Sequence, residues 1–452
     1  MFYQHDTQSY AAYFHYLIGK CYYTNEVTGA CEGGFPTYDF GLDPTGYLTN
    51  DQNNDSFTQE IRLTGATDKI NWTLGGFWLE SEEYWDFYTY IDDYRNSPAF
   101  EAWSYYYPGI APTDSWWNSY QGTDRTDKAI FGEMDIEIIE DRLTALVGGR
   151  WYEIDRELSY GVERPDDRVE ELIPYREAKD DGFIPKYGLE LQITEDIMVY
   201  GVYSEGYRVG GTNRGRGVSK GGPTLPIVYE SDMVENTEFG LKSVFADGKV
   251  ILNAVYYDMT WEDMQGEVTD PSFAFGVPFQ VVVANVGEAT VKGFDIELKA
   301  LLGENFEVGF NMTDIQDAYV LAPPVFDDPR AEGGQIDSGL EPKTPLPLFA
   351  DQSYSLYLDY SGINLFGGTG AFRLQHNFVG DSTNQLTDGS AARLTQGDYR
   401  VTDAILTYEI DQWQARLFVN NISDERGITY EDSQDFDQVW GRNSSNVIRP
   451  RN

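Results

Sequence analysis

The stretch Ala129-Ile-Phe-Gly-Glu-Met-Asp-Ile-Glu-Ile138 decides the fold class of this chain. Its side chains alternate in character: Ile130, Met134 and Ile138 fall on one face of an extended strand, and Glu133 falls on the other. A helix would place apolar residues three and four positions apart, so a period of two indicates a β-strand with one apolar and one polar face.

The same alternation recurs along the chain, and apolar periodicity of helical spacing and comparable length is absent. Further copies lie at residues 187–192, 294–300, 306–312, 354–360 and 413–419. We therefore expect an all-β fold.

Short and long connections alternate between the expected strands. The short ones have about two to five residues and are of the hairpin type. They lie at residues 65–69, 139–142, 194–196, 246–249, 303–305 and 410–411, with a longer one at 361–370. The long polar connections span residues 83–125, 155–182, 208–236, 265–280, 320–352, 380–399 and 421–446. The hairpins predict about fourteen strands between residues 57 and 420, and residues 8–17 predict one more.

Strand length points to a membrane. Several strands run for about ten residues, which is enough to cross a bilayer at a tilt near 45°. Transmembrane barrels also have short turns on one side and long loops on the other. We therefore expect a transmembrane antiparallel up-and-down β-barrel rather than a soluble all-β protein. An aromatic girdle at its strand ends would comprise Trp72, Trp78, Tyr84, Trp151, Tyr203, Tyr207, Tyr256, Tyr257, Tyr360 and Trp413.

The composition excludes several classes of function. The 452 residues include 32 Lys and Arg against 75 Asp and Glu, and the formal charge of −43 argues against a nucleic-acid partner. The three histidines, at positions 5, 15 and 376, have no zinc-type spacing. No serine lies in a Gly-x-Ser-x-Gly turn. We therefore expect no catalytic residues, no metal site and no cofactor.

Six motifs resemble the β-barrel of TonB-dependent outer-membrane receptors and occur in that family's order. They are Ser56-Phe-Thr-Gln-Glu-Ile-Arg-Leu63, Trp72-Thr-Leu-Gly-Gly-Phe-Trp78, Tyr200-Gly-Val-Tyr-Ser-Glu-Gly-Tyr-Arg-Val-Gly-Gly-Thr-Asn213, Glu235-Asn-Thr-Glu-Phe-Gly-Leu-Lys-Ser243, Asn285-Val-Gly-Glu-Ala-Thr-Val-Lys-Gly-Phe-Asp-Ile-Glu-Leu298 and Val419-Asn-Asn-Ile-Ser-Asp424. The resemblance covers residues 57–451. It implies a bacterial outer-membrane protein with a barrel of about 22 strands around a plug.

The resemblance also predicts how the chain is organised. Residues 1–56 would be an N-terminal barrel strand and an external loop with a cysteine pair, and residues 57–452 a C-terminally truncated barrel. About 14–16 of the 22 strands would be present, without the plug and the final strand. We expect an internal fragment that does not form a sealed pore alone, because its open sheet edges are unsatisfied in lipid. Cys21 and Cys31 form a loop-closing disulfide in one interpretation and two free thiols in the other.

The resemblance implies TonB-dependent uptake of a scarce nutrient, with an iron–siderophore complex as the leading substrate. Oligosaccharide uptake by the same class of receptor, a passive porin and a surface-recognition barrel are the alternatives. The implied partners are the TonB-ExbB-ExbD complex, acting through a plug that is absent from this chain, a small-molecule ligand, and outer-membrane lipid including lipopolysaccharide.

Two clusters in the long connections are candidate ligand sites. Trp103, Tyr105, Trp116 and Trp117 would stack on a flat ligand, or would pack on one another and hold their loop folded. Arg208, Arg214 and Arg216 form a basic cluster in an acidic exterior. They would bind an anionic ligand through forked hydrogen bonds, or would pair with acidic loops or lipopolysaccharide.

Overall fold

The computed structural model describes residues 21–24, 31–34, 46–91, 115–163, 169–212, 228–269, 281–323, 325–327, 335–337, 340–386, 393–432 and 444–448. Every regular element within these ranges is a β-strand, which confirms the expected all-β class. Among the same residues, no helix has the length and apolar character needed to cross a membrane.

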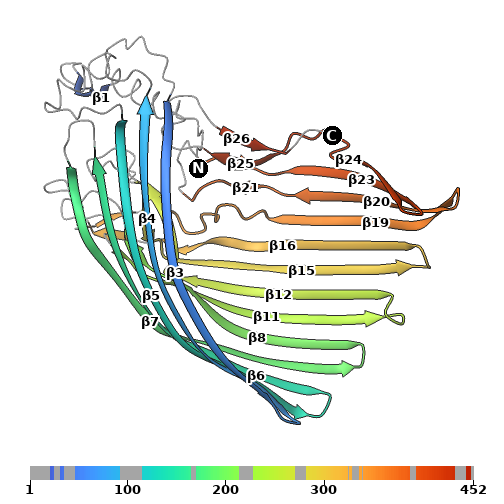
Figure 1. Ribbon diagram of the computed structural model, residues 1–452. Helices are drawn as coiled ribbons and strands as arrows, with labels where there is room; N and C mark the ends of the chain where they lie inside the picture. Colours follow the sequence, from blue (N-terminus) through green and yellow to red (C-terminus); the bar gives the residue numbers. More distant parts are fainter. Residues whose placement is uncertain are drawn as a thin grey trace. The chain divides into compact units, whose positions relative to one another are not determined.

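Fourteen of the described strands form one antiparallel sheet in which each strand lies beside its neighbours in the chain, as in an up-and-down meander. Figure 1 shows the part of this order from β8 to β20 clearly. The expected count of about fourteen strands is confirmed, and the additional strand at residues 8–17 lies outside the described residues. The strands are β3 (Gly46–Ala66), β4 (Ile70–Ile91), β5 (Ser115–Ile139), β6 (Leu143–Glu163), β7 (Val169–Thr194), β8 (Ile197–Arg208), β11 (Asp232–Phe245), β12 (Val250–Glu262), β15 (Glu288–Leu302), β16 (Phe306–Ala322), β19 (Gln352–Leu365), β20 (Gly368–Val379), β23 (Tyr399–Ile410) and β24 (Trp413–Val419).

Short strand pairs lie in the connections between the strands of this sheet and in the segments before β3 and after β24. Each consists of two antiparallel strands and belongs to no larger sheet among the described residues. The pairs are β1 (Cys21–Thr24) with β2 (Cys31–Gly34), β9 (Gly211–Thr212) with β10 (Val228–Tyr229), β13 (Gln265–Thr269) with β14 (Val281–Asn285), β17 (Val325–Asp327) with β18 (Gln335–Asp337), β21 (Ser382–Thr383) with β22 (Thr395–Gln396), and β25 (Ile428–Asp432) with β26 (Ser444–Val447).

The chain divides into two compact units. The first contains Met1–Glu60, Phe77–Lys128 and Glu153–Asp180, and the second contains Ile61–Gly76, Ala129–Tyr152 and Asp181–Asn452. In the first unit, Arg125 Nε donates to Asp127 Oδ1 over 2.7 Å, and Lys128 Nζ lies 3.2 Å from Glu153 Oε1. The expected boundary at residue 56 lies within β3 and stays a prediction.

Tight turns connect the strands at one end of the second unit, as the sequence predicts. Phe366 and Gly367, for example, join β19 to β20 with φ of 50° and 81°, which suits the type I′ turn favoured in two-residue hairpins. Backbone hydrogen bonds connect successive hairpins, such as Ser361 N to Asn305 O over 2.9 Å. At the turn end of the sheet, the strands are therefore held by contacts between residues of the same or adjacent hairpins.

Three of the expected connections have the wrong bounds. The turn predicted at residues 361–370 contains only Phe366 and Gly367. β4 continues to Ile91 and β5 begins at Ser115, within the connection predicted at 83–125. β6 and β7 occupy most of the connection predicted at 155–182. In these stretches of the sequence, apolar and polar residues do not alternate regularly, so the pattern that predicts a strand is missing.

Side chains in the second unit divide between an apolar face and a polar face. Phe239 lies on the apolar face and is 60% exposed, whereas Tyr200 and Glu238 lie on the polar face. Two glycines make room for tyrosine rings on the polar face. A Cβ at Gly240 would lie 2.1 Å from the ring of Tyr200, and one at Gly309 would lie 2.1 Å from the ring of Tyr357. Glycine therefore fits these rings where any larger residue would collide.

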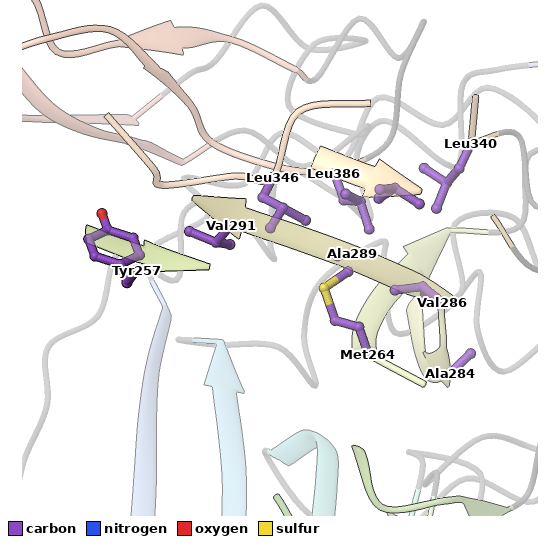
Figure 2. Packing of buried hydrophobic residues seen from close by; sticks show 10 residues of the cluster. Tyr257, Met264, Ala284, Val286, Ala289, Val291, Leu340, Leu346 and Leu386 are labelled. Atoms are coloured by element: carbon purple, nitrogen blue, oxygen red, sulfur yellow. The ribbon is translucent and has the colours of Figure 1, made fainter. Parts of the chain in front are cut away.

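The second unit has a buried core at the end opposite the tight turns, where β12, β15 and β16 meet their long connections (Figure 2). Tyr257 belongs to it and is only 8% exposed, so its predicted place in an aromatic girdle is wrong. The predicted girdle residues Trp72, Trp78, Tyr84, Trp151 and Trp413 are exposed. The core comprises Tyr257, Met264, Ala284, Val286, Ala289, Val291, Val320, Leu340, Leu346 and Leu386.

Candidate functional site

Arg208, a predicted ligand residue, ends β8 and faces the first residue of β11, Asp232. Arg208 Nε donates to Asp232 Oδ2 over 3.1 Å, and Nη2 donates to the same oxygen. The carboxylate is 1% exposed and the guanidinium side chain 50% exposed. Because a buried carboxylate without a partner is costly, Arg208 compensates the buried charge of Asp232.

Gln265, at the start of β13, joins this ion pair to the next connection. Its backbone N–H donates to Asp232 Oδ2 over 2.9 Å, and its carbonyl accepts from Arg208 Nη2 over 2.7 Å. Its Nε2 lies within hydrogen-bonding distance of three backbone carbonyls, those of Arg208 at 3.2 Å, Val209 at 3.1 Å and Glu230 at 3.0 Å. One side chain thus connects both ends of the β8–β11 connection.

Asn285 and Trp261 complete the cluster. Asn285 Nδ2 donates to the carbonyls of Glu230 over 3.0 Å and Asp263 over 2.7 Å, and Asn285 Oδ1 accepts from Glu230 N over 2.8 Å. The Arg208 guanidinium lies 5.2 Å from the ring centroid of Trp261, which packs against the buried core. We call Arg208, Asp232, Trp261, Gln265 and Asn285 the Arg208 cluster.

The Arg208 cluster fixes the base of the connection that contains the other predicted arginines. Strands β9 and β10 pair Gly211 with Tyr229 and Thr212 with Val228, and Gly210 N donates to Ser231 Oγ over 2.9 Å. Arg208 therefore pairs with an acidic neighbour, which was one of its two predicted roles, and its contact with a ligand stays a prediction. Sequence reasoning missed Asp232, Gln265 and Asn285, which lie 22 to 57 positions from the residues they bind.

Most of the other predicted site residues are not tested by the structure. Trp103, Tyr105, Arg214 and Arg216 lie outside the described residues. Trp116 and Trp117 lie on β5 rather than in a loop, and the structure describes only their backbone.

The predicted disulfide also stays a prediction. Strands β1 and β2 pair Cys21 with Gly34 and Thr24 with Cys31. The two cysteines thus occupy opposite ends of this short ladder.

A second polar cluster lies near the tight turns. Glu307 Oε1 accepts from Lys299 Nζ and from the Tyr357 hydroxyl, each over 2.9 Å. Arg373 Nε donates to Asp359 Oδ1 over 2.7 Å, and the guanidinium lies 4.9 Å from the Tyr357 ring centroid. Beside it is an open cavity of about 530 Å³ whose lining includes Glu307, Asp359, Arg373, Thr407 and Arg416.

The polar face also carries an ion pair that crosses an intervening strand. Lys186 Nζ on β7 lies 3.0 Å from Glu133 Oε2 on β5. Gly148, on β6 between them, leaves room because a Cβ there would lie 3.3 Å from Glu133 Cγ. In the part of the chain that the structure describes, no three His, Cys, Asp or Glu side chains are grouped so that they could hold a metal ion.

The chain matches the family model described as TonB dependent receptor-like, beta-barrel, over residues 3–422. This chain belongs to the TonB-dependent receptor family. Its membership places it in the bacterial outer membrane and confirms the resemblance found in the sequence. In such a barrel, the polar face of the strands faces the lumen and the apolar face meets lipid.

Solved structures show the same fold. The ferric yersiniabactin uptake receptor FyuA from Yersinia pestis is 17% identical with a TM-score of 0.66, and the match covers 92% of this chain and 55% of that one. The siderophore receptor PiuA from Acinetobacter baumannii is 15% identical with a TM-score of 0.63, covering 89% and 55%. The ferric-catecholate import receptor Fiu from E. coli K12 is 14% identical with a TM-score of 0.59, covering 90% and 54%. The chain thus spans about half the length of these structures.

Proposed function

We propose that this chain is the barrel of a receptor that imports a scarce nutrient across the outer membrane, with a ferric siderophore as the substrate. The TonB-ExbB-ExbD complex supplies the energy through a plug. The family match over residues 3–422 is the observation that carries this proposal. The names of three structural neighbours, which refer to yersiniabactin, siderophore and ferric-catecholate import, favour iron over other nutrients.

The external connections would supply the ligand contacts. Arg214 and Arg216 follow directly on the Arg208 cluster, whose hydrogen bonds hold both ends of their connection together. Many ferric siderophores present carboxylate or catecholate oxygens, which guanidinium groups bind through forked hydrogen bonds. Trp103, Tyr105, Trp116 and Trp117 would supply flat apolar surface for the chelate. Arg208 itself would position this connection rather than bind the ligand directly.

Deletion of the gene tests the substrate class. The deletion strain should grow more slowly than its parent when iron is chelated and siderophores are supplied one at a time, and the intact gene should restore growth. Equal growth on every siderophore tested, together with a defect on a single glycan as carbon source, would favour oligosaccharide uptake. Uptake that persists without TonB would instead indicate a passive porin.

Substitution of the external arginines tests the ligand contacts. R214A together with R216A should reduce uptake of an anionic radiolabelled ferric siderophore by about tenfold, the effect of losing one to two charge-assisted hydrogen bonds. Arg426 offers a matched control, because it is an arginine in another long connection. Its side chain is strongly exposed and lies 3.9 Å from Asp424. Equal loss of uptake in R426A would contradict a specific role for Arg214 and Arg216.

A further inference from the structure

Two basic residues stand on the lipid-facing side of the strands that the structure describes in the second unit, Lys292 on β15 and Arg400 on β23. Lys292 pairs with Asp258 and lies two residues from Phe294, and Arg400 is opposite Phe378. Each lies ten residues before the last residue of its strand at the tight turn. Because the two residues occupy equivalent positions, the surroundings of Arg400 can be compared with those of Lys292.

The distance from the turns places both residues at a membrane boundary. Ten residues of strand span about 33 Å, which corresponds to about 25 Å along the membrane normal at a tilt near 40°. The apolar band of an outer-membrane barrel is also about 25 Å tall. Because the long connections are external in this family, Arg400 lies level with the lipid headgroups of the outer leaflet.

Lys292 is neutralised within the protein. Its Nζ donates to Asp258 Oδ2 over 2.9 Å, on the neighbouring strand β12. Both side chains are about one-third exposed. A second anion at Lys292 would therefore have to compete with a carboxylate already bound.

Arg400 has no comparable partner among the described residues. The nearest carboxylate oxygen, Asp398 Oδ1, lies 3.9 Å away, and the Arg400 guanidinium forms no hydrogen bond with a described residue. Its guanidinium lies 4.8 Å from the ring centroid of Phe378, and its side chain is 58% exposed. Stacking on an aromatic ring leaves the edge of a guanidinium, with its forked donors, open to an acceptor.

The lipid-facing surface below Arg400 is largely apolar, although it includes His376, whose Nδ1 lies 2.8 Å from Thr402 Oγ1. Tyr354 and Phe378 lie beside it with ring centroids 5.1 Å apart. Towards the tight turns, the same face of β23 continues with Thr402, Ala404 and the exposed Leu406. From the strand end towards the tight turns, the surface thus presents a guanidinium, then aromatic rings, then aliphatic side chains. An amphiphile with an anionic head and an apolar tail has the complementary order of groups.

We propose that Arg400 binds the phosphate of an outer-leaflet lipid headgroup, whose acyl chains then contact the apolar residues below. Charge complementarity selects this ligand. The chain carries a formal charge of −43, so most of its surface repels anions. Among the lipid-facing cations in the described strands of the second unit, Arg400 is the one whose nearest carboxylate oxygen, at 3.9 Å, lies beyond hydrogen-bonding distance. The contact is independent of the nutrient that the receptor imports.

Lipid retention tests this assignment. The protein, expressed as its gene encodes it, is placed in phosphatidylcholine nanodiscs that contain a small fraction of lipid A, and native mass spectrometry counts the lipid A retained. R400Q should retain about fivefold less lipid A, the effect of one interfacial cation. K292Q, the matched control, should retain as much as the parent protein. Lipid A without phosphate should be retained equally by the parent and R400Q.

Three results would overturn the assignment. They are equal retention by R400Q and the parent, an equal loss in K292Q, and displacement of lipid A by millimolar inorganic phosphate, which would identify a site for the free ion. R400K provides a second variant in case R400Q does not fold. It keeps the positive charge but lacks the forked N–H donors of the guanidinium. It should fall between the parent and R400Q, and retention equal to the parent would reduce the contact to nonspecific charge attraction.

Discussion

The two ends of the second unit are ordered by different means. At the turn end, side chains pair across the strand register while they remain partly exposed, as do Arg373 at 47% and Asp359 at 28%. At the loop end, the Asp232 carboxylate is almost completely buried and ten apolar side chains form a core. Hairpin register alone orders the turn end, because neighbouring strands are adjacent in sequence. In the described parts of the long connections, buried side chains hold the chain in place.

The largest effect should follow removal of the buried carboxylate. Asp232→Ala removes the carboxylate that accepts from the Arg208 guanidinium and from the Gln265 N–H. The loss of two to three hydrogen bonds to a charged group should lower the local free energy of unfolding by about 3–5 kcal/mol. Hydrogen exchange of the backbone amides in 263–269 and 281–287 measures this change. Amides of β19 and β20 serve as the internal control. Unchanged exchange in β13 and β14 would show that the core, and not the ion pair, holds this end together.

A smaller loss should follow truncation within the core. Leu346 is buried, and its backbone N–H donates to Ala318 O over 2.9 Å. Leu346→Ala should lower the free energy of unfolding by about 2–4 kcal/mol, through lost burial and the cavity left behind. The same exchange measurement applies. Leu406→Ala, on the exposed lipid-facing side, provides a control of equal chemistry. If both variants behave alike, the core contributes no more than the lipid-facing surface.

These two variants concern interactions that the sequence could not reveal. The alternation at residues 129–138 predicts β5 and its faces, because the side-chain period of a strand is local. Arg208 and Gln265 lie 57 positions apart, and their contact depends on how two long connections fold. The sequence places Tyr257 in a girdle because it lies near a predicted strand end, but its neighbours from distant connections bury it. Local patterns thus predict the sheet, whereas contacts within the connections require tertiary structure.

The pair at the turn end should matter less. Arg373→Gln removes a partly exposed ion pair with Asp359 and the contact with the Tyr357 ring, and should lower the free energy of unfolding by less than about 1 kcal/mol. Urea titration in detergent micelles measures this value. A double-mutant cycle with Asp359→Asn isolates the interaction between the two side chains. A coupling above about 2 kcal/mol would mean that both ends of the unit depend on strong charge pairs.

The smallest effect concerns Glu262, the last residue of β12 at the loop end. Desolvation of the carboxyl group, together with the carboxylates of Glu235 and Glu288, raises the pKa of Glu262 above its ordinary value of 4.5. A raised carboxyl pKa means that the folded state binds the proton more tightly than the unfolded state does. Ionised Glu262 therefore opposes folding, and stability falls as the pH rises from the unfolded-state pKa through the folded-state pKa.

Glu262→Gln removes this charge at every pH. Because the side chain is exposed and solvent screens its neighbours, the variant should gain at most about 0.5 kcal/mol near neutral pH and nothing near pH 4. Urea titrations of both proteins at these two pH values give the difference. A gain of equal size at both pH values would assign the effect to packing rather than charge. A gain confined to neutral pH would show that carboxylate repulsion persists beside a core that is otherwise stabilised by burial.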